Sequence, residues 1–167
     1  MVVSMAAYIL RTQTTVPLDI KRVFAFFADA RNLNRITPPW LHFTMKTDGS
    51  PAMRPGLMLD YRIRLFLIPI SWQTEITVWD PPKRFVDEQR RGPYHWWVHT
   101  HSFTEVEGGT EVEDEVLYNP RGGALTNALF VKRSLRRIFR YRHRALRDAL
   151  GVPDDGVRAR VRIRRSR

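Results

Sequence analysis

The sequence predicts an α+β fold in which a curved antiparallel β-sheet is covered by one long C-terminal helix. Between residues 57 and 118, segments of alternating apolar and polar residues follow one another and are joined by tight turns rich in Gly and Pro. Residues 124–150 contain neither Pro nor Gly, and helix-forming residues dominate there. A sheet with one apolar face needs a cover, and a long amphipathic helix provides it.

The N-terminal third contributes one strand and a short helical region. Residues 8–16 alternate with β-branched and aromatic side chains, which predicts a first strand. Asp19 is placed to cap a short helix that follows. The TPPW motif at residues 37–40 ends this helical region, because residues before proline avoid the α conformation. We expect a second strand to begin at Trp40-Leu41.

The centre of the chain reads as a meander of strands. Residues 57–65 and 72–78 alternate cleanly, as half-buried antiparallel strands do. The stretch WDPPKRFVDEQRRGPYHWWVHTHSF at residues 79–103 then supplies two strands divided by a Gly-Pro turn. A two-residue turn at Gly108-Gly109 is expected to join the second of these strands to one over residues 110–118.

That turn fixes which residues share a face of the sheet. Phe103 would oppose Asp114, His101 would oppose Val116, and His99 would oppose Tyr118. Glu113 and Glu115 lie on the other face and belong in water. The residues predicted to point inward are Trp97, His99, His101, Phe103, Asp114, Val116 and Tyr118. A three-residue turn at 91–93 would add Phe85, Asp87 and Gln89 to this face, whereas a two-residue turn would invert the assignment.

The long helix carries one cation on its apolar side. Its apolar arc consists of Ala128, Val131, Leu135, Ile138, Phe139, Leu146 and Ala149. Its basic residues lie mainly on the opposite side: Lys132, Arg133, Arg136, Arg137, Arg140, Arg144 and Arg147. Arg142 falls within the apolar arc instead. Because an unpaired buried charge is very costly, we expect Arg142 to point inward and pair with Asp87 or Asp114.

Composition bounds the class of protein. The 167-residue chain is 43% hydrophobic and 27% charged, as in an ordinary globular domain. Residues 1–131 contain 14 Lys+Arg and 14 Asp+Glu, whereas residues 132–167 contain 14 and 3, so the C-terminal part supplies the whole net charge of +11. We expect one domain over residues 1–153 and a basic, weakly ordered tail over residues 154–167 that is dispensable for folding. Without a secretion signal or an apolar stretch of membrane-spanning length, the expected location is cytoplasmic.

Four segments carry a resemblance to a known superfamily: TPPW at 37–40, the stretch at 79–103, GTEVEDEVLY at 109–118 and IFRYRHRAL at 138–146. Together they resemble the SRPBCC superfamily, which includes START-type lipid-transfer domains, birch-pollen-allergen-like proteins and polyketide cyclase/dehydrase-like proteins. More narrowly, the chain resembles the bacterial stand-alone cyclase/dehydrase or ligand-binding members of this superfamily, over roughly residues 8–150. It implies a helix-grip fold with an internal pocket. Because the superfamily contains carriers, cyclases and chaperone-binding modules, the fold does not decide the function.

The function favoured by the sequence is binding of a hydrophobic or amphipathic small molecule, such as a lipid, a quinone or a polyketide-like compound, between sheet and helix. An apolar pocket with a few polar groups is the usual form of such a site. The candidate ligand-binding residues are Trp72, Asp87, Gln89, Trp97, His99, His101, Phe103, Asp114, Tyr118 and Arg142. The oligomeric state is left open.

Two other functions remain alternatives. In a cyclase or dehydratase, His99 or His101 would move a proton and Arg142 would steady an enolate, although no residue is assigned as catalytic. Alternatively, the basic helix face and tail would bind nucleic acid or an anionic membrane, which the absence of a reading motif disfavours. No cofactor is expected. No metal site is predicted either, because cysteine is absent and no third ligand beside His99 and His101 is clear beyond Asp87 or Asp114.

Overall fold

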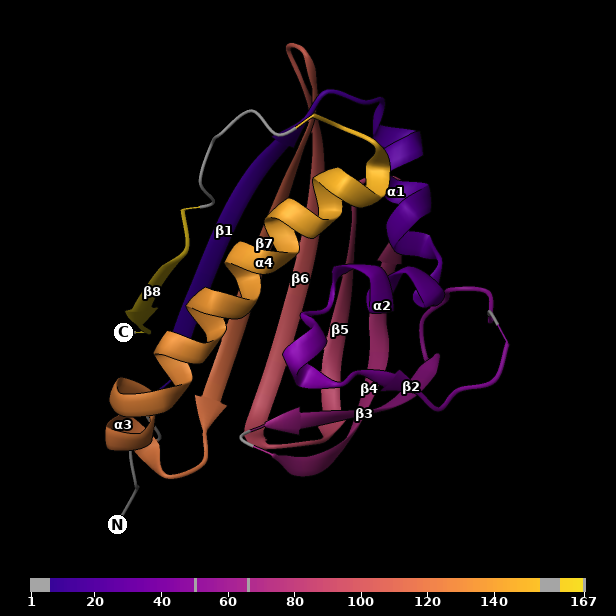
Figure 1. Ribbon diagram of the computed structural model, residues 1–167. Helices are drawn as coiled ribbons and strands as arrows, with labels where there is room; N and C mark the ends of the chain where they lie inside the picture. The colour runs from indigo at the N-terminus through magenta and orange to yellow at the C-terminus, as the bar shows by residue number, and fades with distance from the viewer. Residues whose placement is uncertain (1–6, 50, 66, 154–159, 167) are drawn as a thin grey trace.

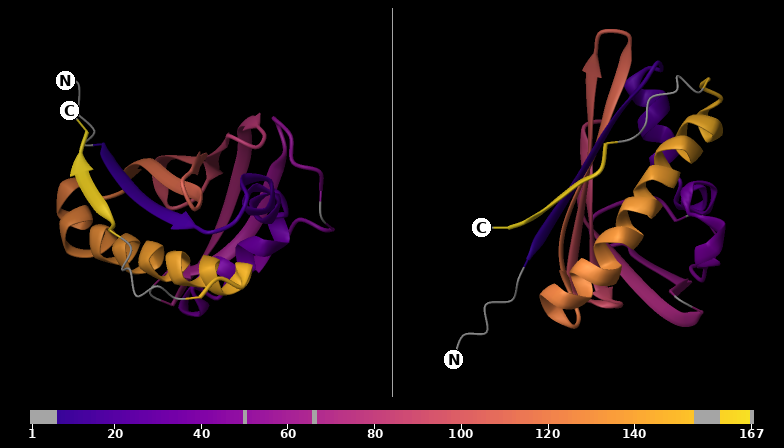
Figure 2. Two further views of the ribbon diagram at one scale, coloured as in Figure 1. Left: turned by 90° about the horizontal axis from the view of Figure 1, so that it is seen from above. Right: turned by 60° about the vertical axis from the view of Figure 1, so that its left-hand side comes forward.

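A curved antiparallel sheet wraps around the long C-terminal helix (Figures 1 and 2). The computed structural model describes residues 7–49, 51–65, 67–153 and 160–166. Within these residues the sheet has eight strands in the order β2-β3-β4-β5-β6-β7-β1-β8. The strands are β1 Tyr8–Val16, β2 Thr44–Met45, β3 Met58–Leu65, β4 Ile68–Asp80, β5 Arg84–Arg91, β6 Tyr94–Val106, β7 Gly109–Pro120 and β8 Arg162–Arg165. The predicted α+β helix-grip architecture is confirmed.

Short helical segments connect β1 to β2 beside the open side of the sheet (Figure 1). They are α1 Ile20–Ala28, η1 Ala30–Asn32, α2 Leu33–Ile36 and η2 Pro39–Leu41. The backbone N–H of Lys21 donates to Asp19 Oδ1 at 2.8 Å, so the predicted cap of α1 is confirmed. The prediction that a strand begins at Trp40-Leu41 is wrong. These residues belong to η2, because Pro39 at its first position favours a helical turn.

The C-terminal helix runs from Gly123 to Leu150 across the concave face of the sheet (Figure 2). It consists of α3 Gly123–Thr126, the π-helical segment η3 Asn127–Val131 and α4 Lys132–Leu150. The predicted helical span of residues 124–150 is therefore confirmed, but the sequence did not predict the π-helical turn within it. It changes the phase of the first turns, and Ala128, predicted to lie in the apolar arc, is exposed.

Arg147 is a second departure from the predicted helix faces. Sequence periodicity places it on the solvent side, yet the residue is only 5% exposed. Its guanidinium donates two hydrogen bonds to the carbonyl of Pro153, at 2.6 and 3.2 Å, and one to the carbonyl of Thr15 at 3.1 Å. The chain after α4 folds back over this side of the helix and supplies the acceptors that a buried guanidinium requires.

The β6–β7 hairpin differs from the predicted register by two residues. Its turn lies at Glu107-Gly108, so that Val106 pairs with Gly109. His101 therefore opposes Asp114, rather than Val116 as predicted. By the same shift His99 opposes Val116 and Phe103 opposes Val112. Because side chains alternate with a period of two, the shift leaves every predicted face unchanged.

The C-terminal residues are part of the sheet. β8 pairs antiparallel with β1, and Val161 is buried while Ile163 is half-buried against the same apolar cluster. The prediction of a weakly ordered tail is therefore wrong for residues 160–166. Residues 154–159, which the same prediction covered, lie outside the described residues. The pairing covers the backbone edge that β1 would otherwise expose, and the alternating VRI pattern suits a strand with one buried face.

Deletion of residues 154–167 is accordingly expected to lower the stability of the domain. Burying a valine stabilises by about 1.5–3 kcal/mol, so we expect a loss of about 2 kcal/mol. For a domain of this size that corresponds to a melting temperature about 4–8 °C lower, measurable by differential scanning calorimetry. Arg164→Ala, which changes an exposed side chain of β8, should leave the melting temperature unchanged. An unaltered melting temperature after the deletion would show that β8 contributes nothing to folding.

Candidate ligand pocket and histidine–aspartate cluster

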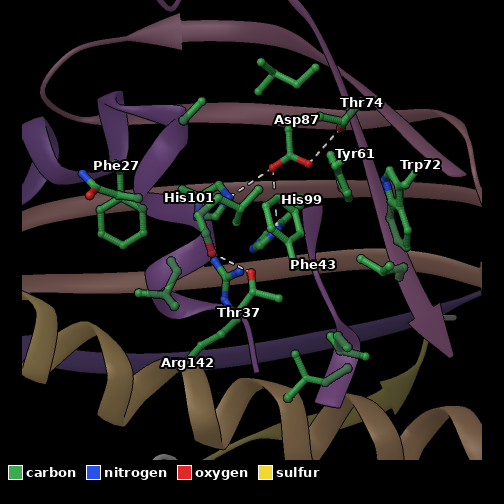
Figure 3. Close-up of a pocket in the computed structure, with 18 of the residues that line it drawn as sticks. Phe27, Thr37, Phe43, Tyr61, Trp72, Thr74, Asp87, His99, His101 and Arg142 are labelled. Carbon is green, nitrogen blue, oxygen red and sulfur yellow. Dashed lines mark hydrogen bonds and ion pairs between the residues drawn. The ribbon is translucent and has the colours of Figure 1, made fainter. Parts of the chain in front are cut away.

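A cavity of about 180 Å³ lies between the concave face of the sheet and α4. The segment from η1 to η2 closes one side of it, and Figure 3 shows side chains from sheet, loop and helix converging on it. Most of its lining is aromatic or aliphatic. The principal apolar residues are Phe26, Phe27, Leu33, Ile36, Leu41, Phe43, Leu59, Tyr61, Ile63, Trp72, Trp97, Leu135, Ile138 and Phe139.

Four polar side chains form a cluster at the cavity wall, and Figure 3 shows three of them: Asp87, His99 and His101. His99 Nε2 lies 3.0 Å from Asp114 Oδ1, and His101 Nε2 lies 3.1 Å from Asp87 Oδ2. Two ion contacts complete the ring: His99 Nδ1 to Asp87 Oδ2 at 3.7 Å, and His101 Nδ1 to Asp114 Oδ1 at 2.8 Å. The last of these is short, but it lies off the hydrogen-bond direction, so we regard it as an electrostatic contact only.

Neighbouring strands position this cluster. Asp87 on β5 lies opposite His99 on β6, and His101 lies opposite Asp114 on β7. Thr74 on β4 donates a hydrogen bond from Oγ1 to Asp87 Oδ1 at 3.1 Å. All five side chains thus come from consecutive antiparallel strands and point to the concave face.

Burial and mutual charge set the protonation of the cluster. Burial raises the pKa of each carboxyl group, but the hydrogen bonds and charges of the histidines outweigh it, so the pKa of Asp87 is lowered and that of Asp114 lies well below its usual range. Burial and the neighbouring His101 lower the pKa of His99. For His101, burial is outweighed by the two aspartates, and its pKa is raised. The cluster therefore favours two carboxylates with the proton on His101 rather than on His99.

Arg142 lines the cavity from α4 but does not form the predicted ion pair (Figure 3). Within the described residues, no carboxylate oxygen lies within 4 Å of its guanidinium. Asp87 and Asp114 are already paired with the two histidines. The guanidinium carbon lies 5.6 Å from the centre of the Phe139 ring, which leaves its N–H groups available to another acceptor.

Residues 14–150 match the family described as a domain of unknown function, DUF8410. The chain belongs to this family. No curated protein that was compared with the chain matches it.

Several solved structures share the fold of this DUF8410 chain. The Zhui aromatase/cyclase from Streptomyces sp. R1128 is 11% identical with a TM-score of 0.69, over 87% of this chain and 94% of that one. Ara h 8.0201 is 10% identical with a TM-score of 0.65, over 86% and 97%. Protein Ms6760 from Mycobacterium smegmatis is 19% identical with a TM-score of 0.64, over 86% and 90%. These structures share the helix-grip fold that the sequence predicts.

Six of the ten candidate ligand-binding residues of this DUF8410 chain line the cavity: Trp72, Asp87, Trp97, His99, His101 and Arg142. Four do not. Phe103 packs against Phe24 and Phe27 in the core, and Tyr118 is fully buried and donates to Asn127 Oδ1 at 3.0 Å. Asp114 does not line this cavity; it contacts both histidines and lines a smaller cavity of about 20 Å³, to which Arg142 also contributes.

Gln89 closes the β5–β6 turn instead of facing the cavity. Its amide donates to the carbonyl of Tyr94 at 3.0 Å and accepts from the backbone N–H of the same residue at 3.3 Å. The Gln89 side chain passes so close to Gly92 that a Cβ there would lie 2.3 Å from its amide oxygen. A side chain at position 92 would therefore displace the Gln89 amide from its place in this turn.

Several residues that line the cavity are not among the predicted ligand-binding residues. Tyr61 and Ile63 were signalled by the alternation in β3, and Ile138 and Phe139 by the apolar arc of the helix. Thr37, Leu41 and Phe43 carried no such signal, because they reach the cavity through the path of the η1–η2 segment and not through a periodic pattern. Among the residues that the structure describes, no helix has the length and apolar character needed to cross a membrane.

Proposed function

We propose that this protein binds a small amphipathic molecule, with a compact apolar body and an anionic group, in the cavity between the sheet and α4. The observation that carries the proposal is a mainly apolar cavity into which Arg142 brings a cation that has no carboxylate partner among the residues that the structure describes. A half-buried guanidinium is costly until an anion approaches it. A bound carboxylate, enolate or phenolate would meet that need.

The size of the cavity narrows the choice of ligand. Its volume of about 180 Å³ is close to the roughly 150 Å³ of an engineered cavity that binds benzene. One or two fused rings fit this space, whereas a long acyl chain does not. Of the classes left open by the sequence, a short polyketide-like compound is therefore favoured over a lipid, and a small aromatic acid fits the same space.

A second hydrogen-bond donor without a partner in the described residues, the indole N–H of Trp72, indicates that the ligand carries a hydrogen-bond acceptor. Trp72 lines the cavity, and its indole Nε1 is buried without a hydrogen-bond partner in the described part of the chain. A buried donor left unpaired costs roughly 1–3 kcal/mol, so a ligand oxygen at this position would be stabilising. Tyr61, whose pKa burial raises well above its usual value, keeps its hydroxyl proton and can also donate.

A matched pair of probes tests the proposal. We expect 2-naphthoate to bind at least about tenfold more tightly than the neutral, similarly shaped 2-naphthamide, because a hydrogen bond to a charged group contributes about 1.5–3 kcal/mol. Arg142→Met should remove this preference while leaving 2-naphthamide binding unchanged, as measured by isothermal titration calorimetry. Arg140→Met, which alters an exposed arginine of the same helix, is the control. Equal binding of the two probes to the wild-type protein would refute an anion-directed site.

The histidine–aspartate cluster supports an enzyme as the second candidate. A histidine with a carboxylate partner in the wall of a ligand cavity is suited to proton transfer near neutral pH. His101→Asn separates the two functions. In a binding protein it changes affinity only, whereas in an enzyme it abolishes turnover of a bound compound, followed by mass spectrometry, while binding persists.

A further inference from the structure

Three atoms of the histidine–aspartate cluster converge on one point at the cavity wall. Asp87 Oδ2 lies 3.1 Å from His101 Nε2 and 3.7 Å from His99 Nδ1. One potential ligand atom from each of Asp87, His99 and His101 lies within 4.8 Å of the other two. Bonds of about 2.0–2.2 Å from nitrogen and oxygen ligands to a metal hold such ligand atoms about 3.0–3.6 Å apart. The observed separations are therefore close to those of a metal-binding triad.

The far atom of each of these side chains lies beside another polar group. Asp114 Oδ1 lies 3.0 Å from His99 Nε2, as a hydrogen-bond partner, and 2.8 Å from His101 Nδ1, as an electrostatic contact only, so the hydrogen bond orients His99 and the carboxylate charge faces both imidazoles. Asp87 is held in the same way, by the hydrogen bond from Thr74 to its other oxygen. Metal-binding histidines characteristically donate their second N–H to a carboxylate, which fixes the ring orientation and increases its basicity.

We propose that Asp87, His99 and His101 bind one divalent transition-metal ion, with Asp114 and Thr74 as positioning residues. Two histidines and one carboxylate on adjacent strands leave the remaining coordination positions directed into the cavity, because all three side chains line it. Imidazole and carboxylate ligands suit zinc, iron, nickel and related ions, and the chain contains no cysteine that would select a softer one. The carboxylates of Asp87 and Asp114 together balance a charge of +2. Of the two aspartates that the sequence offered as a third ligand, Asp87 is the one grouped with both histidines.

This site goes beyond the proposed binding of an amphipathic molecule and can be tested without any organic ligand. The chelator-treated, full-length protein is titrated with Co²⁺, followed by its visible absorption, and with Zn²⁺, followed by calorimetry. We expect one equivalent to bind with saturable absorption bands. Asp87→Ala and His101→Ala should each weaken binding by at least about 100-fold, and Asp114→Asn by about 10- to 100-fold.

His95→Ala is the matched control, because His95 lies on the same strand but is exposed to solvent. It should retain wild-type affinity, and far-UV circular dichroism verifies that each variant is folded. The absence of absorption bands and of binding heat in the wild-type protein would overturn the proposal whether or not the variants fold, and would identify the cluster as a proton-sharing network. Equal loss of binding in His95→Ala and His101→Ala would overturn it as well.

Discussion

Replacement of Asp114 by alanine is expected to lower the free energy of unfolding by about 3–5 kcal/mol, the usual cost of removing one partner from a buried ion pair. The Asp114 side chain is only 14% exposed and contacts both His99 and His101. Without it, two buried imidazoles share one carboxylate, and the positive charge favoured on His101 loses half of its compensation. Urea unfolding of the chelator-treated protein at pH 7 measures the loss.

The control for this prediction is the adjacent residue of the same strand. Glu115 pairs with Arg11 near the surface, where both side chains are accessible to solvent. Because exposed ion pairs contribute about 0–1 kcal/mol, Glu115→Ala should cost no more than that. A similar cost for Asp114→Ala would mean that the cluster contributes little to folding and that its arrangement reflects another requirement, such as binding.

Filling the cavity is expected to have the largest effect on ligand binding. Ile138 faces the cavity from α4, and an indole at this position would occupy much of the available 180 Å³. Ile138→Trp should therefore weaken binding of 2-naphthoate by at least about 100-fold, since overpacking even a few methylene groups into a closed core costs about 1–3 kcal/mol and a displaced ligand loses its contacts altogether. Calorimetric titration provides the measurement.

Arg140→Trp introduces the same side chain on the exposed side of α4. It should bind 2-naphthoate as the wild-type protein does. Both variants should remain folded, because the cavity can accommodate the indole in one and solvent surrounds it in the other. Undiminished binding to Ile138→Trp would place the ligand outside the cavity and would contradict the proposed function directly.

Local periodicity accounts for the parts of the fold that could be predicted. Alternation with a period of two identified the strands and the face on which His99 and His101 lie, and the run without Pro or Gly identified the helix from residue 124 to residue 150. These features depend on neighbours in the chain, so the sequence alone contains them. The faces survived even an error of two residues in the β6–β7 register, because such a shift preserves their parity.

Contacts between distant segments account for the parts of the fold and of the site that the sequence did not predict. The turn at Glu107-Gly108, and not at Gly108-Gly109, places His101 opposite Asp114 and so creates the cluster. Gly108 adopts a left-handed conformation there, while a Cβ on Gly109 would lie 2.1 Å from the Val16 carbonyl oxygen of the neighbouring strand. The position of this turn thus depends on β1, about ninety residues earlier in the chain, and hairpin rules alone do not include it.

Arg142 and Arg147 of α4 show the same contrast between what periodicity predicts and what distant contacts decide. Helical periodicity correctly placed Arg142 on the inner side but could not supply its partners, and the aspartates chosen for it pair with the histidines. Arg147 is buried only because the segment after α4 returns and offers the Pro153 carbonyl. Likewise, β8 exists because the edge of β1 is available to pair with it. Periodicity determines which way a side chain points, whereas its partners depend on which distant segments the folded chain brings beside it.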